Sequence, residues 1–429
     1  MRSLWPTGGL WRHGDFLKLW SAETISQFGS QVGGLALPLV AILVLDATAF
    51  EVAALTTVEF LPFILFTLPA GVWVDRLPRR PILIAGDFGR AVLLLTVPIA
   101  YVADVLTLEQ LFVVGFLVGI FQVFFDVAYM SYLPALVDRD QIIEGNSKFE
   151  VSRSAAQVGG PGLGGVLVQV FTAPYAVLLD ALSFLASGLF IVGIRKEEPR
   201  PEVAQIDGRK PSMWTELKEG LRFVLGHPNL RAQAGCTATS NLFSSAVFGI
   251  LLVFAVRELD LSPGLIGVIF SAGAAGSLAA AVSATRVTRR FGIGPTSIVT
   301  AAFFGPTMLL IAFAPEGTAA IPFLIAAMLI FGYTVVVYNI AQVSYRQAIC
   351  PPRLQGRMNS VMRFLVWGTI PVGTLLGGAL ATWIGFRETI VVGAIGGGLG
   401  ALFLLFSPQR HLRELPDPIE DTVTEPAAA

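Results

Sequence analysis

Charge is scarce in this sequence. Only 14% of the 429 residues are Asp, Glu, Lys or Arg, while 54% are hydrophobic and the mean hydropathy is +0.71. A soluble domain of this size needs a charge-rich surface, so water is not the main solvent of this chain. The net charge of −1 also lacks the basic excess of a nucleic-acid-binding protein. We therefore expect a membrane protein with no nucleic-acid partner.

The side chains that most enzymes and metal sites use are also rare. The sequence has two Cys, which imply no disulfide framework, and three His, all outside the long apolar runs. They are Cys236, Cys350, His13, His227 and His411. No Gly-x-x-x-x-Gly-Lys-Ser/Thr loop for ATP is present. We therefore expect no enzyme, no metal ion, no cofactor and no direct drive by ATP.

Long apolar runs dominate the rest of the sequence. A helix needs roughly 20 residues to cross about 30 Å of hydrocarbon, and it pairs its backbone N–H and C=O groups internally. Twelve runs are long enough, at residues 16–45, 51–75, 81–103, 107–132, 146–170, 174–194, 230–256, 262–285, 294–314, 319–345, 358–384 and 387–407. The sequence therefore predicts an all-α membrane protein with twelve transmembrane helices. The first span itself is expected to be the insertion signal, because no removable signal peptide precedes it.

The loops give an orientation and a division into parts. Most of the 29 Lys and Arg residues fall in alternate loops and in the two tails, which predicts cytoplasmic termini, 1–15 and 408–429, in a bacterial inner membrane. The longest connection, 195–229, begins with a Pro- and Glu-rich stretch that cannot build a core. We predict that it links two six-helix bundles, 16–194 and 230–407. The C-terminal tail is acidic and is expected to be disordered.

The linker contains a short helical pattern. Trp214, Leu217, Leu221 and Val224 recur at helical spacing after Ser212, a suitable N-cap. This pattern predicts an amphipathic helix on the inner membrane surface. A simple spacer is the alternative.

An internal repeat supports the two bundles. A shift of 213 residues superimposes identical residues between 128 and 167, among them the pair Asn146-Ser147 on Asn359-Ser360 and the pair Gly164-Gly165 on Gly377-Gly378. The repeat predicts two pseudo-symmetric halves related by an axis along the membrane normal. A substrate site is then expected between them, near the middle of the membrane.

The loop between the second and third spans carries a family signature. Residues 71–80 read Gly-Val-Trp-Val-Asp-Arg-Leu-Pro-Arg-Arg, which resembles the inner loop of the major facilitator superfamily, with Pro78 in place of the usual Gly. The resemblance implies a conformational latch that favours the outward-facing state, formed by Gly71, Asp75, Arg76, Arg79 and Arg80. An acid at the inner end of a helix can meet the positive N-terminus of another helix. Positive-inside anchoring is the alternative, but it does not explain Asp75.

A second signature lies in the fifth span. Gly160, Pro161, Gly164 and Gly165 resemble the Gly-Pro-x-x-Gly-Gly element of antiporters in this superfamily, which implies an exporter. Small residues let helices approach closely, and proline permits a bend. The repeat partner has Thr374 instead of proline, so we expect this bend in the N-terminal half alone. Ordinary small-residue packing is the alternative.

Over the whole chain the sequence is most similar to the branch of macrolide-efflux proteins and the enterobactin exporter. The runs at 59–62, 75–76 and 87–90 carry this similarity. Drug-proton antiporters of other branches place an Arg early in span four, and this chain has none there. Their assignment of a proton relay therefore does not transfer.

Ionisable residues inside the spans are functional candidates, because charge at membrane depth is costly. The residues Asp87, Arg90, Asp126 and Arg153 are expected to form an inner gate network or a static cluster of ion pairs. Glu59 lies near mid-membrane with no basic residue on its own span, where a carboxyl group favours its protonated form. We take Glu59, Glu23 and Asp126 as candidates for proton coupling. The alternative for Glu59 is that its carboxylate is the counter-ion of a cationic substrate. Asp180 lies nearer the outer end of its span and is expected to be in water.

The remaining polar residues predict a weakly polar cavity that suits a bulky amphiphile. Its candidate lining is Gln27, Gln31, Glu59, Phe63, Gln122 and Asn241. The expected function is therefore proton-driven export of a small amphiphilic molecule, resembling a drug, a macrolide or a siderophore, by a monomer in contact with lipid. An importer or facilitator of the same fold, or a non-transporting receptor, is the alternative.

Overall fold

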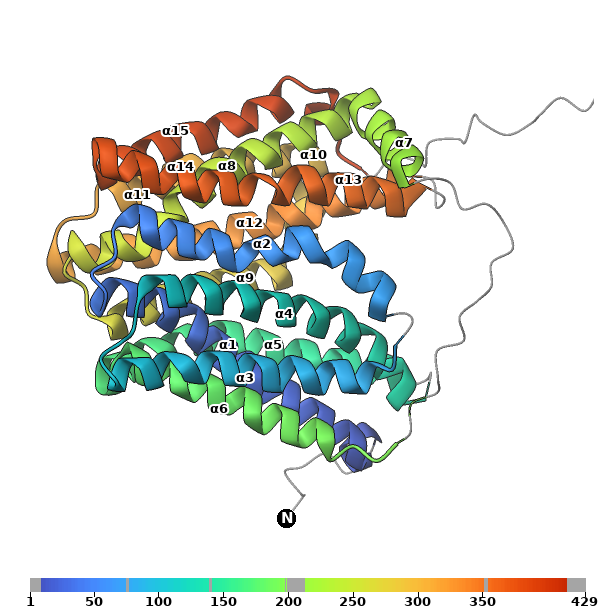
Figure 1. The fold of residues 1–429 in the computed structure, drawn as a ribbon. Coiled ribbons are helices and arrows are strands. Elements are labelled where there is room, and N and C mark those ends of the chain that lie inside the picture. Colours follow the sequence, from blue (N-terminus) through green and yellow to red (C-terminus); the bar gives the residue numbers. More distant parts are fainter. Residues whose placement is uncertain are drawn as a thin grey trace, which may run out of the picture. The chain divides into compact units, whose positions relative to one another are not determined.

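The computed structural model describes residues 9–74, 77–138, 141–196, 198, 213–350 and 354–414. Within these ranges all regular structure is helical (Figure 1). Helices satisfy the backbone of long apolar runs without water, which is the physical reason for this fold. Each of the twelve predicted spans contains a helix or a pair of helices, so the predicted all-α class is confirmed.

The helices follow the chain in a regular order. The first six are α1 (Gly14–Leu43), α2 (Ala49–Val74), α3 (Arg79–Val102), α4 (Leu108–Leu136), α5 (Ile142–Phe171) and α6 (Ala173–Val192). The others are α7 (Met213–Gly226), α8 (Pro228–Arg257), α9 (Pro263–Phe291), α10 (Ile293–Ala302), α11 (Phe304–Ala312), α12 (Ile321–Ile349), α13 (Gln355–Trp367), α14 (Thr369–Ile384) and α15 (Phe386–Leu405). Short 3-10 turns lie at η1 (Gly9–Arg12), η3 (Gly317–Ala320) and η5 (Pro408–His411).

Eleven spans among the described residues have the length and apolar composition of a membrane-crossing helix. The remaining predicted span is α5, which has 30 residues but carries Lys148, Glu150 and Arg153 in its first half. These charges and the many glycines that follow lower its hydropathy. Its length is still sufficient to cross the hydrocarbon layer.

Two predicted spans are each interrupted at one residue. The span 294–314 divides into α10 and α11, and the span 358–384 divides into α13 and α14. A proline removes the hydrogen bond to the carbonyl four residues earlier. Pro306 and Pro371 lie four residues after Ala302 and Trp367, the last residues of α10 and α13. The helix therefore ends at the carbonyl that loses its donor.

The fifth span contains the proline of the second signature. The helix α5 runs without interruption from Ile142 to Phe171 although Pro161 lies inside it. Its repeat partner, which has Thr374 at the matching position, is divided at Gly368, but this residue keeps helical backbone angles, φ −62° and ψ −21°. A bend in the N-terminal half alone therefore stays a prediction.

By its contacts the chain divides into two compact units. The first contains the described residues up to Glu198 together with 250–274 and 316–321, and the second contains 213–249, 275–315 and the described residues from 322 on. The end of α8 and the start of α9 thus belong to the first unit. This division differs from the predicted bundles, 16–194 and 230–407, which stay a prediction.

In the first unit, α3 packs against both α4 and α6, and α1 packs against α5 and α6 (Figure 1). A core cluster joins four of these helices through Phe16, Leu83, Tyr132 and Ile191, all nearly or fully buried. Helices that pack this closely can hold polar side chains between them away from both water and lipid. The candidate site lies among these contacts.

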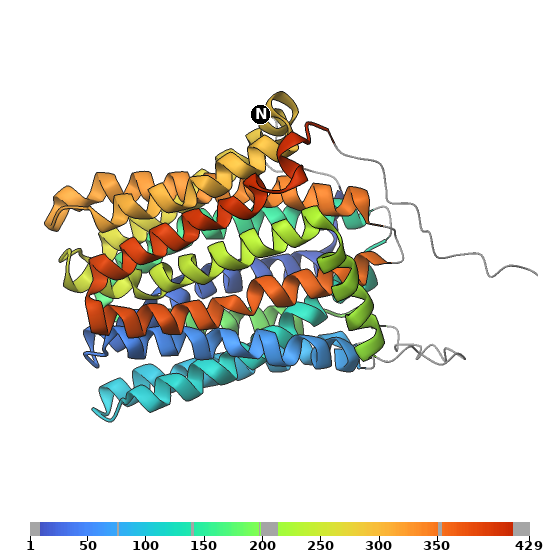
Figure 2. The ribbon, with the colours of Figure 1, turned by 90° about the horizontal axis from the view of Figure 1, so that it is seen from above.

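In the second unit, α15 packs against α10, α11 and α14, and the short helix α7 packs against α13 (Figure 2). A methyl group on Gly220 would lie 2.9 Å from the carbonyl oxygen of Arg357, and Glu219 forms an ion pair with Arg357. The predicted linker helix therefore exists and is fixed to the bundle. Its predicted place on the inner membrane surface stays a prediction, and residues 199–212 of the linker lie outside the described residues.

Candidate functional site

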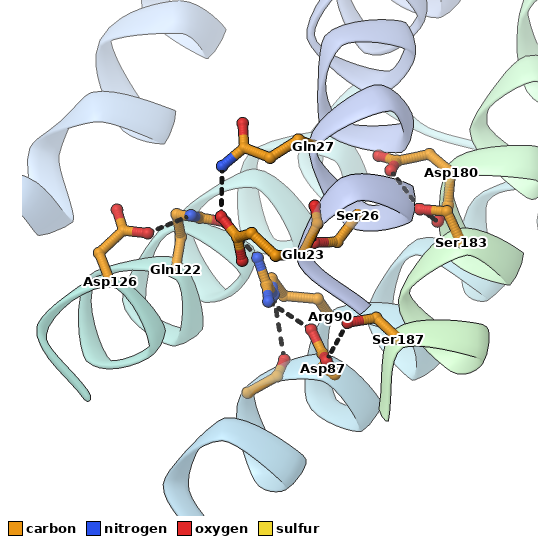
Figure 3. Close-up of polar contacts among 11 residues, drawn as sticks. Glu23, Ser26, Gln27, Asp87, Arg90, Gln122, Asp126, Asp180, Ser183 and Ser187 are labelled. Carbon is orange, nitrogen blue, oxygen red and sulfur yellow. Dashed lines mark hydrogen bonds and ion pairs between the residues drawn. The ribbon is translucent and has the colours of Figure 1, made fainter. Parts of the chain in front are cut away.

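A buried ion pair on α3 is the centre of the polar group in the first unit. Arg90 Nη2 lies 2.6 Å from Asp87 Oδ1, and both side chains are at most 1% exposed. The spacing of three residues brings them together on one face of the helix. Ser187 of α6 donates to Asp87 Oδ2 over 2.6 Å. The pair is therefore fixed between two helices and satisfied by hydrogen bonds (Figure 3).

Aromatic rings complete the surroundings of Arg90. Its guanidinium carbon lies 4.4 Å from the centroid of Phe125 and 4.0 Å from that of Phe184. Its Nε also donates to the carbonyl of Gly86 over 3.1 Å. Cation–π contacts are strongest when the cation is desolvated, as here. Arg90 is thus held on several sides.

From Arg90 the network reaches α4 through an amide. Arg90 donates a hydrogen bond to Gln122 Oε1, and Gln122 Nε2 donates to Asp126 Oδ1 over 2.7 Å. No ion pair joins Arg90 and Asp126 within the described residues. Figure 3 shows Gln122 between them. Asp126 therefore interacts with Arg90 through the two hydrogen bonds of Gln122, an arrangement that we call the relay.

A second carboxyl group enters from α1. Glu23 is 6% exposed, and Gln27 Nε2 donates to its Oε1 over 2.7 Å. Its other oxygen, Oε2, is buried and has no hydrogen-bond partner among the described residues. A buried polar atom without a partner is costly, which makes a proton or a ligand at this oxygen favourable. Figure 3 places Glu23 beside Arg90 and Gln122.

Arg153 does not join this group. It lies on α5, more than half exposed, and pairs with Glu150 at 3.0 Å. The sequence placed it in the inner charge network because it lies at a similar depth along its span. Glu150 and Arg153 instead pair with each other three residues apart on α5, whereas Asp87, Arg90 and Asp126 form hydrogen bonds with Gln122, Ser187 and the carbonyl of Gly86.

Glu59 lies on α2, apart from the arginine. Its side chain is half-buried, and a methyl group on Gly115 of α4 would lie 2.9 Å from its Cγ. It forms no ion pair within the described part of the chain. Phe63, one turn further along α2, stacks on Phe60 with ring centroids 5.7 Å apart. Glu59 is thus a carboxyl group without a cation.

The other predicted cavity residues lie in different places. Gln31 packs against α5, where a methyl group on Gly160 would overlap its side chain. Asn241 lies in the second unit and donates to the carbonyl of Val366 over 3.1 Å. Gln27 and Gln122 belong to the polar group around Arg90. The structure thus brings Gln27, Gln122 and Glu23 together, while Gln31, Glu59 and Phe63 lie elsewhere in the first unit.

The glycines of the fifth span face two neighbours. A methyl group on Gly160 would overlap Gln31 of α1, and one on Gly164 would lie 3.2 Å from Val32 Cα, also on α1. On the other side, a methyl group on Gly165 would overlap the carbonyl of Pro263, in the part of α9 that belongs to the first unit. The motif therefore allows α5 to pack closely on two sides at once.

Pro161 takes part in the second of these contacts. A methyl group on Gly267 of α9 would overlap the carbonyl oxygen of Pro161, and the Gly162 N–H donates to Ser271 Oγ over 3.0 Å. Both contacts lie within the first unit. The backbone around Pro161 is thus tied to α9 by a hydrogen bond and by close packing.

Only part of the predicted latch can be placed. Asp75 and Arg76 lie outside the described residues, and Gly71 lies in the last turn of α2. Arg79 Nη1 pairs with Glu198 at 3.1 Å, and the backbone N–H groups of Arg79 and Arg80 donate to the same carboxylate over 2.9 and 3.1 Å. A carboxylate at a helix N-terminus is favoured by the helix dipole. Glu198 therefore caps α3.

Arg80 and Asp15 also bind backbone groups at the end of α6 and in the residues that follow it. Arg80 Nη2 donates to the carbonyl of Val192 over 2.6 Å, as cations commonly do at a helix C-terminus. The carboxylate of Asp15 accepts from the backbone N–H groups of Arg195 and Lys196 over 3.2 and 2.9 Å. The start of the linker is therefore fixed to the first unit.

Sequence reasoning missed three polar residues. Asp180 was expected in water, but it is 4% exposed between α6 and α1. Ser187 and Glu198 were not singled out, although each binds a candidate residue. For Asp180 the available signal was the glycine pair Gly29 and Gly33, whose spacing of one helical turn marks a close helix contact. No signal in the sequence marked Glu198 as a cap.

The first unit holds more carboxyl groups than cations inside its apolar helices. Glu23, Asp87 and Asp180 are buried, and Glu59 and Asp126 are half-buried. Within the described residues, Arg90 is the single cation that is buried among them. Ionised carboxylates cannot remain unpaired away from water, so most of these groups must bind protons or meet another cation. Such an arrangement is suited to proton exchange.

The chain resembles known transporters along almost its whole length. Residues 9–426 match the family described as "Transmembrane secretion effector". The "Multidrug efflux pump Tap" of Mycolicibacterium fortuitum is 25% identical over 377 residues, which cover 86% of this chain and 90% of that protein. The "Uncharacterized MFS-type transporter YfiS" of Bacillus subtilis is 26% identical over 382 residues, with 88% and 89% covered.

Solved structures share the fold at lower identity. A bacterial homologue of the iron transporter ferroportin has a TM-score of 0.71 at 19% identity, covering 93% of this chain and 99% of that one. The nucleoside transporter NupG has a TM-score of 0.72 at 13% identity, with 91% and 98% covered. At these identities the similarity concerns the fold alone.

Proposed function

Because the chain belongs to the transmembrane secretion effector family of major facilitator transporters, we propose that it exports a small amphiphilic molecule in exchange for protons. The chain is a multi-pass membrane transporter with a small-molecule substrate. Our proposal adds the direction, the amphiphilic substrate, the proton and alternating access. It also places a monomer in the bacterial inner membrane, surrounded by lipid, with both termini in the cytoplasm.

The observation that carries proton exchange is the excess of buried carboxyl groups over cations in the first unit. Asp87 is already paired with Arg90, which leaves Glu23, Glu59 and Asp126 as the candidate carriers named from the sequence. Each can be neutral when protonated and needs water or a cation when ionised. A transporter that binds protons on one side of the membrane and releases them on the other uses this difference.

Two observations favour export of an amphiphile. Relatives with 25% and 26% identity bear the name "Multidrug efflux pump Tap", and the glycines around Pro161 pack α5 closely against α1 and α9. For the latch, Arg79 and Arg80 bind Glu198 and the end of α6 within the first unit. We propose that Gly71, Asp75 and Arg76 complete a switch between conformations there.

The function is tested in inverted membrane vesicles that contain the protein or lack it. The probes are a fluorescent lipophilic dye, a macrolide and a siderophore, each with an imposed proton gradient. We expect uptake of at least one probe into inverted vesicles, and we expect loss of uptake when an ionophore removes the gradient. Uptake only into right-side-out vesicles would favour an importer, and transport that ignores the gradient would favour a facilitator. A protein that binds a probe without moving it would be a receptor.

A further inference from the structure

Asp180 of α6 lies in a notch that α1 forms with two glycines. A methyl group on Gly33 would overlap Asp180 Oδ2 and lie 2.8 Å from its Cγ, while one on Gly29 would overlap Ser183 Oγ and lie 2.7 Å from Asp180 Oδ1. The carboxyl group thus occupies the space beside Gly33, and Ser183 and the carboxyl group together fill the space beside Gly29. Asp180 is 4% exposed, and Figure 3 shows it on the α1 side of α6.

The notch offers the carboxyl group little compensation for a negative charge. Ser183 Oγ donates to the Asp180 backbone carbonyl over 2.7 Å and approaches Asp180 Oδ1 only to 3.4 Å. Asp180 takes part in no ion pair within the described residues. An ionised carboxylate removed from water without a partner is far more costly than the neutral acid. This geometry favours a proton on Asp180.

The charged groups of the neighbouring helices are already engaged. On α3, Arg90 is the cation whose field reaches Asp180, but it is paired with Asp87 and bonded to Gln122. On α1, the carboxyl group of Glu23 is bonded to Gln27. On α5, Glu150 and Arg153 pair with each other in an exposed position. None of these groups replaces a proton on Asp180 without breaking its own contacts.

We propose that Asp180 binds and releases a proton during transport, and that the bound proton keeps α1 closed against α6. The proposal rests on the proton exchange proposed above. The carboxyl group takes its proton from water on one side of the membrane and returns it to water on the other, and no other bond changes. The carboxylate left behind requires hydration, for which the notch has no room. Loss of the proton therefore moves α1 away from α6.

The first test detects the proton on Asp180 independently of transport. Infrared difference spectra of the full-length protein in lipid are recorded across pH, for wild type and for Asp180→Asn. We expect wild type to show the carbonyl stretch of a protonated carboxyl group and Asp180→Asn to lack one such signal. Because an amide resembles the neutral acid in shape and charge, Asp180→Asn should also keep the thermal transition of wild type. An unchanged carboxyl signal, or a strongly destabilised variant, would overturn the proposal.

The second test uses two neighbouring glycines as a matched pair. Gly33→Ala places a methyl group where Asp180 Oδ2 lies, whereas Gly34→Ala meets no atom within 4 Å. Both changes affect helix propensity equally. We expect Gly33→Ala to change the pH at which the Asp180 signal titrates and to lower the thermal transition, and Gly34→Ala to match wild type. Equal behaviour of the two variants would contradict the packing of Asp180 against Gly33.

Transport measurements then connect the proton to function. Asp180→Asn should lose gradient-driven dye transport by on the order of 10²-fold, the loss typical of removing a group that transfers a proton. It should still bind the dye. An Asp180→Asn protein that responds to the gradient as wild type does would overturn the role in coupling. If wild type moves no probe at all, the proposed function fails, while the infrared titration still decides whether Asp180 carries a proton.

Discussion

Arg90 and Asp126 are joined by one amide. Gln122 accepts a hydrogen bond from Arg90 and donates one to Asp126 over 2.7 Å, so the cation and the carboxylate interact without forming an ion pair. An amide can do both because it carries an acceptor oxygen and a donor nitrogen. A change of charge on Asp126 therefore reaches Arg90 through Gln122. This relay also leaves Asp126 partly exposed, where a proton or a substrate can reach it.

The relay predicts an effect of Gln122→Met. The thioether keeps the size of the side chain but removes both hydrogen bonds, so Arg90 and Asp126 each lose a partner. We expect a loss of stability of about 1–3 kcal/mol and slower transport. Thermal unfolding and dye transport check this. Gln110→Met is the control on the same helix, because Gln110 binds Thr96 away from the polar group. Equal effects of the two variants would contradict the relay.

The buried pair on α3 predicts a strong effect of Arg90→Gln. The change leaves the carboxylate of Asp87 buried without its cation, which typically costs about 3–5 kcal/mol. Asp87→Asn in the same chain removes that charge and should restore most of the stability. Thermal unfolding of the two single variants and the double variant checks this prediction. Additive losses in the double variant would mean that the two residues do not act as a pair.

The buried carboxyl group of Glu23 predicts that Glu23→Gln loses proton coupling. Glu23→Gln keeps the contact with Gln27 but cannot bind or release a proton, so gradient-driven transport should fall on the order of 10²-fold. Dye binding should be retained. Glu109→Gln provides the control, because Glu109 is exposed in the first turn of α4. Full gradient-driven transport by Glu23→Gln would exclude Glu23 from proton coupling. Glu59→Gln then tests Glu59 in the same assay.

The cap on α3 predicts an effect of Glu198→Gln. The side chain of Glu198 is 5% exposed and binds Arg79 and two backbone N–H groups, so its charge is worth roughly 1–2 kcal/mol at this helix end. We expect lower thermal stability and altered turnover, because the cap binds Arg79 and Arg80, two residues of the proposed latch. Glu150→Gln breaks an exposed pair and should cost less than about 1 kcal/mol. A Glu198→Gln protein as stable as Glu150→Gln would argue against the cap.

Pro161→Ala tests the seam in α5. Since α5 is already continuous, the change should restore one backbone hydrogen bond with little effect on folding. We expect weaker export, because the carbonyl of Pro161 packs against Gly267 and the added N–H alters this contact. Pro98→Ala in α3 is the control, since Pro98 also lies inside a helix. If Pro161→Ala matches wild type in both vesicle orientations, the packing around Pro161 no longer supports export.

The spans could be predicted from the sequence because their length and apolar composition are set by the hydrocarbon layer. The pair Asp87 and Arg90 could be expected too, since three residues separate them on one helix. Position along a span does not say which side of the helix is packed, however. Asp180 was therefore expected in water, although it is buried where Gly29 and Gly33 leave room on α1. Arg153 was expected in the network around Arg90, but it pairs with Glu150.

Contacts between distant residues were harder to foresee. Glu198 follows α6 in the chain and binds the start of α3, and no periodicity relates the two positions. The hydrogen bonds of Gln122 to Arg90 and Asp126 were not foreseen either, and its place in the cavity lining stays a prediction. The sequence also did not show which span would be divided. The helix α5 is continuous through Pro161, whereas the span with Pro371 is divided at Gly368.

Both repeat partners keep a helical path near their proline. The helix α5 is unbroken at Pro161, and Gly368 has φ −62° and ψ −21° with its N–H bonded to the carbonyl of Phe364. Two spectroscopic labels at the ends of either span should therefore keep their separation when the substrate binds. Because α7 packs on α13, a label on α7 should follow any movement of that span.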